Sequence, residues 1–308
     1  MIRRGYNQIK SELQRNFRSK EFSVVLSGEY SRDDADWNYK DVPHLNIVHS
    51  QVDSLQAWIA QEAIATINFQ KIFFLTIPMV VFNYDAGKYN QVYFTSFGPI
   101  MLLVNTVTRG DDKACKVTTN YCLFAKSPFH WFFPILQRLI LRNNSILMSE
   151  DTPMRNRRGI LRRAGHTFFS PTETYGYSFT TEIHRNNVRL TRKQKSVCLA
   201  MVDLVNPRIK TVGEGVGILS FRVHREKNVV SIWATTCPHE GAELTVDQQC
   251  LKRGFVECPW HGRRLAPVCV IQDGKLLRVN ERLPYKVDFE TESVTITYVG
   301  DSEGRLSA

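Results

Sequence analysis

The sequence lacks a long apolar run. Its longest apolar stretch extends from Ile72 to Phe82 and is interrupted by Pro78. A helix that crosses a bilayer needs about 20 consecutive apolar residues, so we expect no membrane span. The charged first residues are not followed by the apolar segment of a secretory signal. These absences lead us to expect a soluble cytoplasmic protein.

The cysteines do not have the pattern of a disulfide framework. There are seven, an odd number, which favours a reducing compartment. The chain has 308 residues, of which 43% are apolar. This length and composition are sufficient to bury a core in each of two domains.

Two short motifs, Cys237-Pro-His239 and Cys258-Pro-Trp-His261, each combine a thiolate with an imidazole. The prolines and the following glycines favour tight turns that direct both side chains to one metal pair. Two Cys for one iron and two His for the other are the ligands of a [2Fe–2S] cluster with unequal irons. A Cys2His2 zinc site is the alternative, but its histidines normally lie on a helix at wider spacing. We therefore predict a cluster held by these four residues.

Both motifs resemble the Rieske iron–sulfur domain, and Cys258 to Arg264 is close to that family's second loop. Rieske proteins of respiratory chains carry an additional Cys in each loop. This chain has Ala242 and Trp260 at the matching places. The resemblance therefore implies the lower-potential cluster of oxygenases and their ferredoxins.

A second group of candidate ligands lies near the start of the chain. His44 and His49 are five residues apart, which places both within reach of one ion if the segment is helical. Asp41-x-x-His44-x-x-x-x-His49 resembles the catalytic motif of the Rieske non-haem iron oxygenases. In that family the leading Asp connects the cluster to a mononuclear iron, and a distant Asp is the third ligand. The resemblance implies that His44, His49 and Asp151 bind Fe(II) and that Asp41 is the catalytic bridging residue.

Asp151 follows another acidic residue, as the third ligand of that family often does. Its alternative role is a helix N-cap, with Pro153 in the first helical turn. The two roles are compatible.

The residues between these ligands predict an antiparallel sheet and a long helix. Strands are expected over 71–83, 91–108 and 116–124, with a hairpin turn at 85–88 and an amphipathic helix over 127–147. Asp151 would lie just past the end of that helix. This order resembles the helix-grip (START/SRPBCC-like) domain of the oxygenases, in which a sheet wraps a long helix and leaves an apolar pocket.

The later part of the chain predicts many short strands. We expect a closing strand over 172–184, a linker over 186–195, and then the small all-β Rieske fold. The predicted class is α+β, with a catalytic helix-grip domain in residues 1–195 and a Rieske domain in residues 196–308. Most Rieske oxygenases have the opposite domain order. In that family electrons pass between neighbouring subunits, so the resemblance implies a homotrimer.

The net charge of +10 is unevenly distributed. Between Pro153 and Lys195 ten Lys or Arg occur with only two Glu. A solvated face is one interpretation. A docking surface for an acidic electron donor, a ferredoxin or a reductase, is the other. No recognition motif accompanies the charge, so we expect no nucleic-acid partner.

Together these features predict an oxygenase component that uses O2 to hydroxylate a hydrophobic or aromatic substrate, as a monooxygenase or a dioxygenase. The alternative is an apolar-ligand-binding helix-grip module fused to a Rieske electron carrier or redox sensor, without mononuclear iron. A ferredoxin-like donor with an inert first domain is a third interpretation. Iron content separates the first two, because only the oxygenase needs iron beyond the cluster.

Overall fold

The computed structural model describes residues 5–72, 75–170, 172, 176–180, 182–193, 195–204 and 210–300. Its contacts divide the chain into two compact units, residues 1–159 with 170–181 and residues 160–169 with 182–308. The expected boundary lay at residue 195. The structure thus assigns residues 160–169 and 182–195 to the second unit rather than the first.

The first unit contains one antiparallel sheet of seven strands in the order β1-β7-β6-β5-β4-β3-β2. Alternating side chains of each strand face the two sides of the sheet, so each side collects its own apolar set. The strand bounds are β1 Arg18–Gly28, β2 Val52–Ala60, β3 Ala63–Ile72, β4 Leu75–Gly87, β5 Asn90–Phe97, β6 Ile100–Gly110 and β7 Cys115–Ala125.

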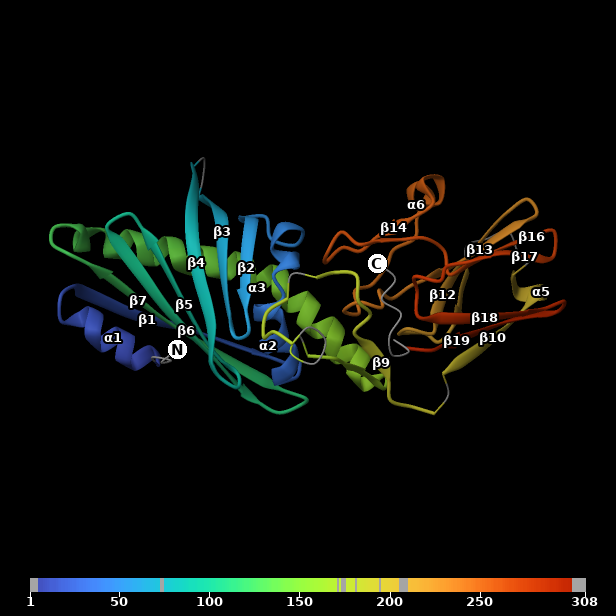
Figure 1. Ribbon diagram of the computed structural model, residues 1–308, viewed down its shortest axis with the longest axis horizontal. Helices are drawn as coiled ribbons and strands as arrows, with labels where there is room; N and C mark the ends of the chain where they lie inside the picture. Colours follow the sequence, from blue (N-terminus) through green and yellow to red (C-terminus); the bar gives the residue numbers. More distant parts are fainter. Residues whose placement is uncertain are drawn as a thin grey trace. The chain divides into compact units, whose positions relative to one another are not determined.

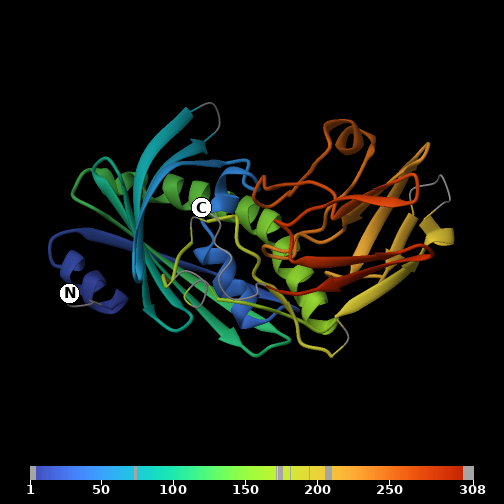
Figure 2. The same cartoon turned by 45° about the vertical axis from the view of Figure 1, so that its right-hand side comes forward.

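Helix α3, Phe133–Arg163, crosses one face of this sheet, as both ribbon views show (Figures 1 and 2). Phe133 and Ile140 of the helix pack against Leu102 and Val104 of β6. A one-turn helix η2, Phe129–Phe132, precedes it. The first unit is therefore a helix-grip fold, as predicted.

The opposite face of the sheet is covered by α1, Tyr6–Gln14. Leu103, the neighbour of Leu102 in β6, points to this side and packs against Ile9 and Leu13 of the helix. Helix α2, Arg32–Lys40, and the one-turn helix η1, Pro43–Asn46, connect β1 to β2. They carry the segment in which the first candidate ligands lie.

Three expectations about this unit were wrong. Residues 91–108 form two paired strands, β5 and β6, rather than one. The long helix does not end at residue 147 but continues to Arg163, so Asp151 and Pro153 lie inside it and Asp151 is not an N-cap. Pro153 removes one backbone donor from the helix, but the helix continues beyond it. In the preceding turn the hydroxyl of Thr152 donates to the carbonyl of Met148 at 2.6 Å. The described part of residues 172–184 forms no strand; Thr180 instead makes an isolated bridge with Asp41.

The second unit is built almost entirely of short antiparallel strands, as predicted. Its sheets have the orders β10-β19-β18, β11-β12-β13-β16-β17, β14-β15 and β8-β9. Two short helices, α5 Met201–Leu204 and α6 Gln248–Arg253, interrupt them. The strand bounds are β8 His166–Phe168, β9 Val188–Leu190, β10 Ser196–Ala200, β11 Lys210–Gly213, β12 Ser220–Glu226, β13 Val229–Ala234, β14 Val256–Glu257, β15 Arg264–Leu265, β16 Cys269–Gln272, β17 Lys275–Val279, β18 Tyr285–Glu290 and β19 Ser293–Tyr298.

The chain is α+β, with the helix-grip unit preceding the all-β unit. Within the described ranges, no helix is both long enough and apolar enough to cross a bilayer.

Candidate functional site

The first candidate site is positioned by the start of α2. The hydroxyl of Ser31 caps this helix by accepting from the backbone N–H of Asp34 at 3.1 Å. The Asp34 carboxylate in turn accepts from Nε of Arg158 on α3 at 2.9 Å, and both side chains are buried. This ion pair fixes α2 against α3, so the residues that follow α2 lie beside the middle of α3.

His44 and His49 do not share a helix, contrary to the expectation. His44 lies in η1, and His49 lies in the turn before β2. The turn is held by Asn46, whose side chain donates to the carbonyl of Ser54 at 2.8 Å and accepts from its N–H. His49 Nδ1 lies 3.0 Å from Glu150 Oε2 on α3. Loop geometry rather than helical spacing therefore brings the two imidazoles together.

The structure brings His44, His49 and Asp151 into one buried cluster. The Nε2 atoms of the two histidines are 3.2 Å apart. Asp151 Oδ1 lies 3.5 Å from Nε2 of His44 and 3.4 Å from Nε2 of His49. Three donor atoms thus form a nearly equilateral triangle.

This triangle fits a divalent transition-metal ion. Atoms bound to one such ion at about 2.0–2.2 Å lie about 3.0–3.5 Å apart when the bond angles are between about 90° and 110°. Two imidazoles and one carboxylate on one face are the donor set of non-haem Fe(II) sites, which leave further positions open. The donor atoms of His44, His49 and Asp151 therefore suit Fe(II) in both chemistry and spacing.

Asp41 lies on the far side of His44. It is buried, and its Oδ2 is 3.7 Å from Nδ1 of His44. A carboxylate at the outer nitrogen of a ligating imidazole fixes the orientation and tautomer of that ring. Asp41 is therefore placed to act through His44.

Sequence reasoning missed two residues that hold Asp151. Arg155, one helical turn later and fully buried, donates from Nη2 to Asp151 Oδ2 at 3.3 Å. Asn38 donates to Asp151 Oδ1 at 3.2 Å and accepts from Nε of Arg155 at 2.9 Å. The i, i+4 spacing of Asp151 and Arg155 would have indicated this pair if the helix had been extended through Pro153.

Without an ion these groups form an ionic network. Burial alone lowers the pKa of His44, but the neighbouring carboxylates of Asp151 and Asp41 raise it to about 10. Burial raises the pKa of Asp151, but the hydrogen bond from His44 and the charge of Arg155 hold it below its ordinary value. A cation that bound to this triangle would therefore have to displace a proton from His44 and would release it.

We expect Arg155→Met to weaken Fe(II) binding about 10- to 100-fold, because the unrestrained Asp151 carboxylate loses its fixed orientation. A competition titration against a coloured chelator measures the affinity. Arg138→Met changes an exposed arginine on the same helix and is the matched control. Unchanged affinity in folded Arg155→Met would show that this arginine does not position the ligand.

The second candidate site consists of two loops with the same backbone pattern. In the first, the N–H of Cys237 donates to Ala242 O at 2.8 Å and the N–H of Gly241 donates to Cys237 O at 3.0 Å. In the second, the N–H of Cys258 donates to Arg263 O at 2.8 Å and the N–H of Gly262 donates to Cys258 O at 2.9 Å. Each turn is therefore closed by the same pair of backbone hydrogen bonds.

Glycine is required in the first of these turns. Gly241 has a φ of +89°, and a Cβ there would lie 2.5 Å from Cδ1 of Leu161. A side chain would be strained and would also collide with its neighbour.

The four side chains of the loops meet in the interior. Cys237, His239, Cys258 and His261 are all buried. Nδ1 of His239 lies 3.2 Å from Nδ1 of His261. A hydrogen bond from the Cys258 thiol lowers the pKa of Cys237 to about 6, which favours the thiolate that iron binds. The two imidazoles thus lie side by side and the two thiols are hydrogen-bonded, and these are the two ligand pairs that a [2Fe–2S] cluster with unequal irons requires.

A basic segment runs beside the first loop. Backbone N–H groups of Asn187 and Val188 donate to His239 O and Pro238 O at 3.0 and 3.1 Å. The cationic residues exposed along this part of the chain are Arg185, Arg189, Lys193 and Lys195.

Two other members of the expected docking surface, Arg155 and Arg158, are buried, so that expectation was wrong for them. Each occurs at a helical position that faces a buried acid, Asp151 for Arg155 and Asp34 for Arg158. The charge count over 153–195 therefore overstated the exposed basic surface.

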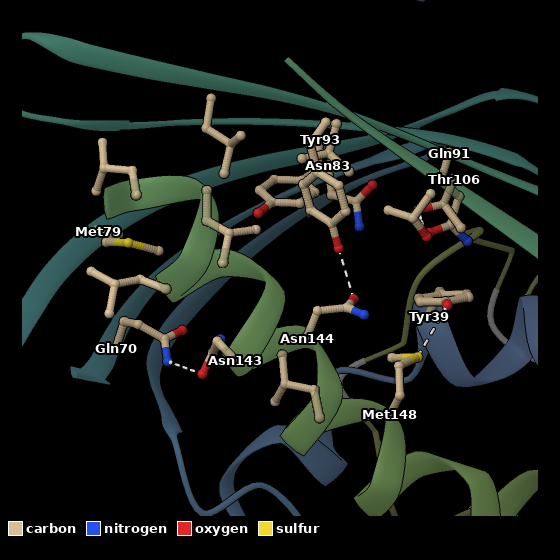
Figure 3. A pocket seen from close by; sticks show the side chains of 18 of the residues that line it. Tyr39, Gln70, Met79, Asn83, Gln91, Tyr93, Thr106, Asn143, Asn144 and Met148 are labelled. Carbon is tan, nitrogen blue, oxygen red and sulfur yellow. Dashed lines mark hydrogen bonds between the residues drawn. The ribbon is translucent and has the colours of Figure 1, made fainter. Parts of the chain in front are cut away.

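The first unit also contains a partly open cavity of about 200 Å3 between its sheet and α3 (Figure 3). Its wall includes Tyr39 of α2 and Met148 of α3, which approach each other at 3.7 Å. Met148 precedes Asp151 by three residues on the same helix, and Asn38, the neighbour of Tyr39, contacts Asp151 directly. The cavity therefore lies next to the residues that hold the histidine–aspartate cluster.

Solved structures similar to the first unit share little sequence with it. They include Zhui aromatase/cyclase from Streptomyces sp. R1128, with 10% identity over 48% of this chain and 99% of that chain and a TM-score of 0.41. A START superfamily protein from Mycobacterium smegmatis has 10% identity over 44% of this chain and 97% of that chain, with a TM-score of 0.36. Norcoclaurine synthase from Thalictrum flavum has 10% identity over 50% of this chain and 96% of that chain, with a TM-score of 0.34.

A search of curated proteins found no match. A comparison with protein families matched residues 197–281 to the Rieske [2Fe-2S] domain. The match includes both loops and the strands from which they extend. Residues 197–281 are therefore a Rieske domain, which implies a [2Fe–2S] cluster in this chain.

Proposed function

We propose that the chain is an oxygenase component that hydroxylates an organic substrate with O2 and with electrons from its Rieske cluster. The observation that carries this proposal is the buried triangle of His44, His49 and Asp151 beside a cavity. A Rieske cluster transfers single electrons, and a mononuclear iron is an acceptor that can use them. A binding module without catalysis would not require two imidazoles and a carboxylate directed at one point.

Four residues hold the cluster in this proposal: Cys237 and Cys258 bind one iron, and His239 and His261 bind the other. His44, His49 and Asp151 bind Fe(II). Bound there, Fe(II) supplies the activation that ground-state O2 needs to react with closed-shell molecules.

The remaining residues orient these ligands. The Asp41 carboxylate lies 3.7 Å from the outer nitrogen of His44 and, as the resemblance implies, links that ring to a cluster histidine. Glu150 holds Nδ1 of His49 at 3.0 Å and accepts from the Ser50 hydroxyl at 2.7 Å. Asn38 and Arg155 hold Asp151. Ligands fixed in this way bind metal more tightly and in one geometry.

The experiment is a single turnover. Protein reduced under anaerobic conditions and freed of reductant is mixed with a set of hydrophobic and aromatic compounds and then with isotopically labelled O2. Mass spectrometry should find labelled oxygen in an organic product, one atom for a monooxygenase or two for a dioxygenase. Oxidation of the cluster without a labelled product from any compound would contradict the proposal.

The electron donor in this proposal is an acidic ferredoxin or reductase that docks on Arg185, Arg189, Lys193 and Lys195. This segment bonds to the backbone of the first cluster loop, so a donor there would lie close to the cluster. The assembly is a homotrimer, in which the resemblance places electron transfer between neighbouring subunits.

We expect Arg185→Glu together with Arg189→Glu to raise the KM for an acidic ferredoxin about tenfold or more at low salt, with little change in kcat. Reversing two charges weakens the electrostatic attraction that steers docking. Steady-state assays at several salt concentrations measure the effect, which should diminish as salt screens the charges. Lys275→Glu, an exposed basic position elsewhere in the second unit, is the control. An equal effect in the control would argue against a docking surface on this segment.

A further inference from the structure

The cavity of the first unit has an apolar wall and a polar wall. Leu102 and Val104 of β6 face Leu136 and Ile140 of α3 across the apolar part. The sheet also contributes a row of polar side chains, because Gln91, Thr106 and Thr119 are directly paired across β5, β6 and β7. Asn83 of β4 lies in the next row, opposite Tyr93. A molecule in this cavity would therefore contact carboxamide and hydroxyl groups as well as hydrocarbon.

Two of these carboxamides have unmet hydrogen-bonding capacity. Among the described residues, the buried Oδ1 of Asn83 and Nε2 of Gln91 have no hydrogen-bond partner. Both residues line the cavity, in which Figure 3 shows them on the sheet side. A buried polar group without a partner is costly, so such groups are normally satisfied.

In two other carboxamides of the same cavity, the side-chain oxygen has a hydrogen-bond partner. Asn144 accepts from the Tyr121 hydroxyl at 2.7 Å, and Asn143 accepts from Gln70 at 3.2 Å, as the dashed lines in Figure 3 mark. Among the described residues that line the cavity, Asn83 and Gln91 are thus the two with a fully buried side-chain polar atom that lacks a partner. Each of these two atoms is screened from the cavity by its neighbours, so a ligand reaches it only when the Asn83 or Gln91 side chain rotates. A ligand that can both donate and accept, as a hydroxyl or an amide does, would then supply a partner to one carboxamide oxygen and one carboxamide N–H.

Charge is absent from the lining. No Lys, Arg, Asp, Glu or His is among the described residues that line the cavity, although the chain has a net charge of +10. An ionised ligand group would be buried there without a counter-charge, which is strongly unfavourable.

The volume of the cavity indicates how large a group it can surround. At about 200 Å3, it is larger than the roughly 150 Å3 cavity that holds benzene and smaller than the roughly 300–1,000 Å3 pockets of drug-sized ligands. One ring or two fused rings fit this range.

From these observations we infer that the cavity binds an uncharged molecule of one or two rings that carries a hydroxyl or amide, which Asn83 and Gln91 recognise. That this ligand is the substrate rests on the proposed function. Gln91 and Asn83 are specificity residues, since they discriminate between ligands by their polar groups and do not contact the proposed metal ligands.

The test uses three compounds that share one bicyclic skeleton: indane, 5-indanol and indane-5-carboxylate. Calorimetric titration of the oxidised holoprotein, without reductant, measures binding in the absence of turnover. We expect 5-indanol to bind about tenfold more tightly than indane and at least about 100-fold more tightly than the carboxylate. Equal binding of the carboxylate and the alcohol, no preference for the alcohol over indane, or no binding of any of the three would overturn the inference.

A variant pair identifies the residues. Asn83→Leu with Gln91→Leu should bind indane as well as the wild type does or better, and should lose the tenfold preference for 5-indanol. Asn7→Leu, which removes an exposed carboxamide on α1, should keep that preference. A preference that persists in the double variant would contradict the assignment to these two residues.

The outcomes separate this inference from the proposed function. If the oxidised protein shows the expected order of affinities but no compound is hydroxylated after reduction, the proposed function fails and the ligand class remains. If labelled product forms but the carboxylate binds as tightly as the alcohol, the ligand class fails and the oxygenase remains.

Discussion

Replacing Asp151 with alanine is expected to eliminate product formation and to lower the iron content from about three atoms per chain to about two. Asp151 supplies one corner of the donor triangle, at 3.5 and 3.4 Å from the two imidazole nitrogens. Without it two neutral imidazoles remain, too few to hold Fe(II) firmly. Its loss also leaves the buried Arg155 without its carboxylate partner, which adds a stability cost of about 3–5 kcal/mol.

Metal analysis and single-turnover product yield are the measurements. The visible spectrum of the cluster should be unchanged, because Asp151 belongs to the first unit and the four cluster residues belong to the second. Asp53→Ala removes a half-exposed carboxylate of the same unit that pairs only with Lys71 in the described structure, and it should behave as wild type. Full iron content and normal product yield in Asp151→Ala would refute its role as a ligand.

Replacing Asp41 with alanine is expected to lower coupled turnover by about 100-fold while both kinds of iron remain bound. The Asp41 carboxylate lies 3.7 Å from Nδ1 of His44, on the side of the ring opposite the donor triangle. It is a positioning residue for His44, and the resemblance also assigns it the link to the cluster. Loss of an outer carboxylate typically reduces metal affinity or activity about 10- to 100-fold.

Rapid mixing of the reduced variant with O2 and substrate separates the possible defects. Slow reoxidation of the cluster, with iron content unchanged, is the result expected for a lost link. Asp112→Ala changes an exposed acid and is the control. Wild-type reoxidation and turnover in Asp41→Ala would defeat the assignment.

The cluster loops were predictable because the residues that define each loop are close together in the sequence. Each contains its two candidate ligands within four residues, together with the proline and glycine that its turn needs. Gly241, for example, has a positive φ and leaves no space for a Cβ. Part of the sheet of the first unit was predictable for a similar reason, since alternating apolar residues such as Leu102 and Val104 specify one buried face. Strands β1 and β2 were not expected.

The first site required contacts that no local pattern contains. The apolar pattern placed the end of the long helix at residue 147 and Pro153 in the first turn of a possible later helix, although the structure continues α3 to Arg163. The positions of Asp151 and Arg155 on one helical face were therefore not evident. Asn38 is separated from both by more than 100 residues and is recognised only when α2 and α3 are seen together.

The basic segment shows a limit of counting charges. Arg158 was counted as surface charge, but it lies against the Trp37 ring and pairs with buried Asp34. A count of Lys and Arg contains no information on the buried acids that neutralise some of them. The exposed cations beside the first cluster loop are the part of that prediction that remains a proposal.

The most direct test of the oxygenase proposal is the iron content of anaerobically purified protein, measured with electron paramagnetic resonance of the reduced state. We predict about three iron atoms per chain: two that give the signal of a reduced Rieske cluster and one in a high-spin ferrous site that becomes visible when nitric oxide is added. The nitric oxide signal should disappear in Asp151→Ala while the cluster signal stays. About two iron atoms and a cluster signal alone, in protein supplied with excess Fe(II), would contradict the account and leave a Rieske electron carrier joined to a binding module.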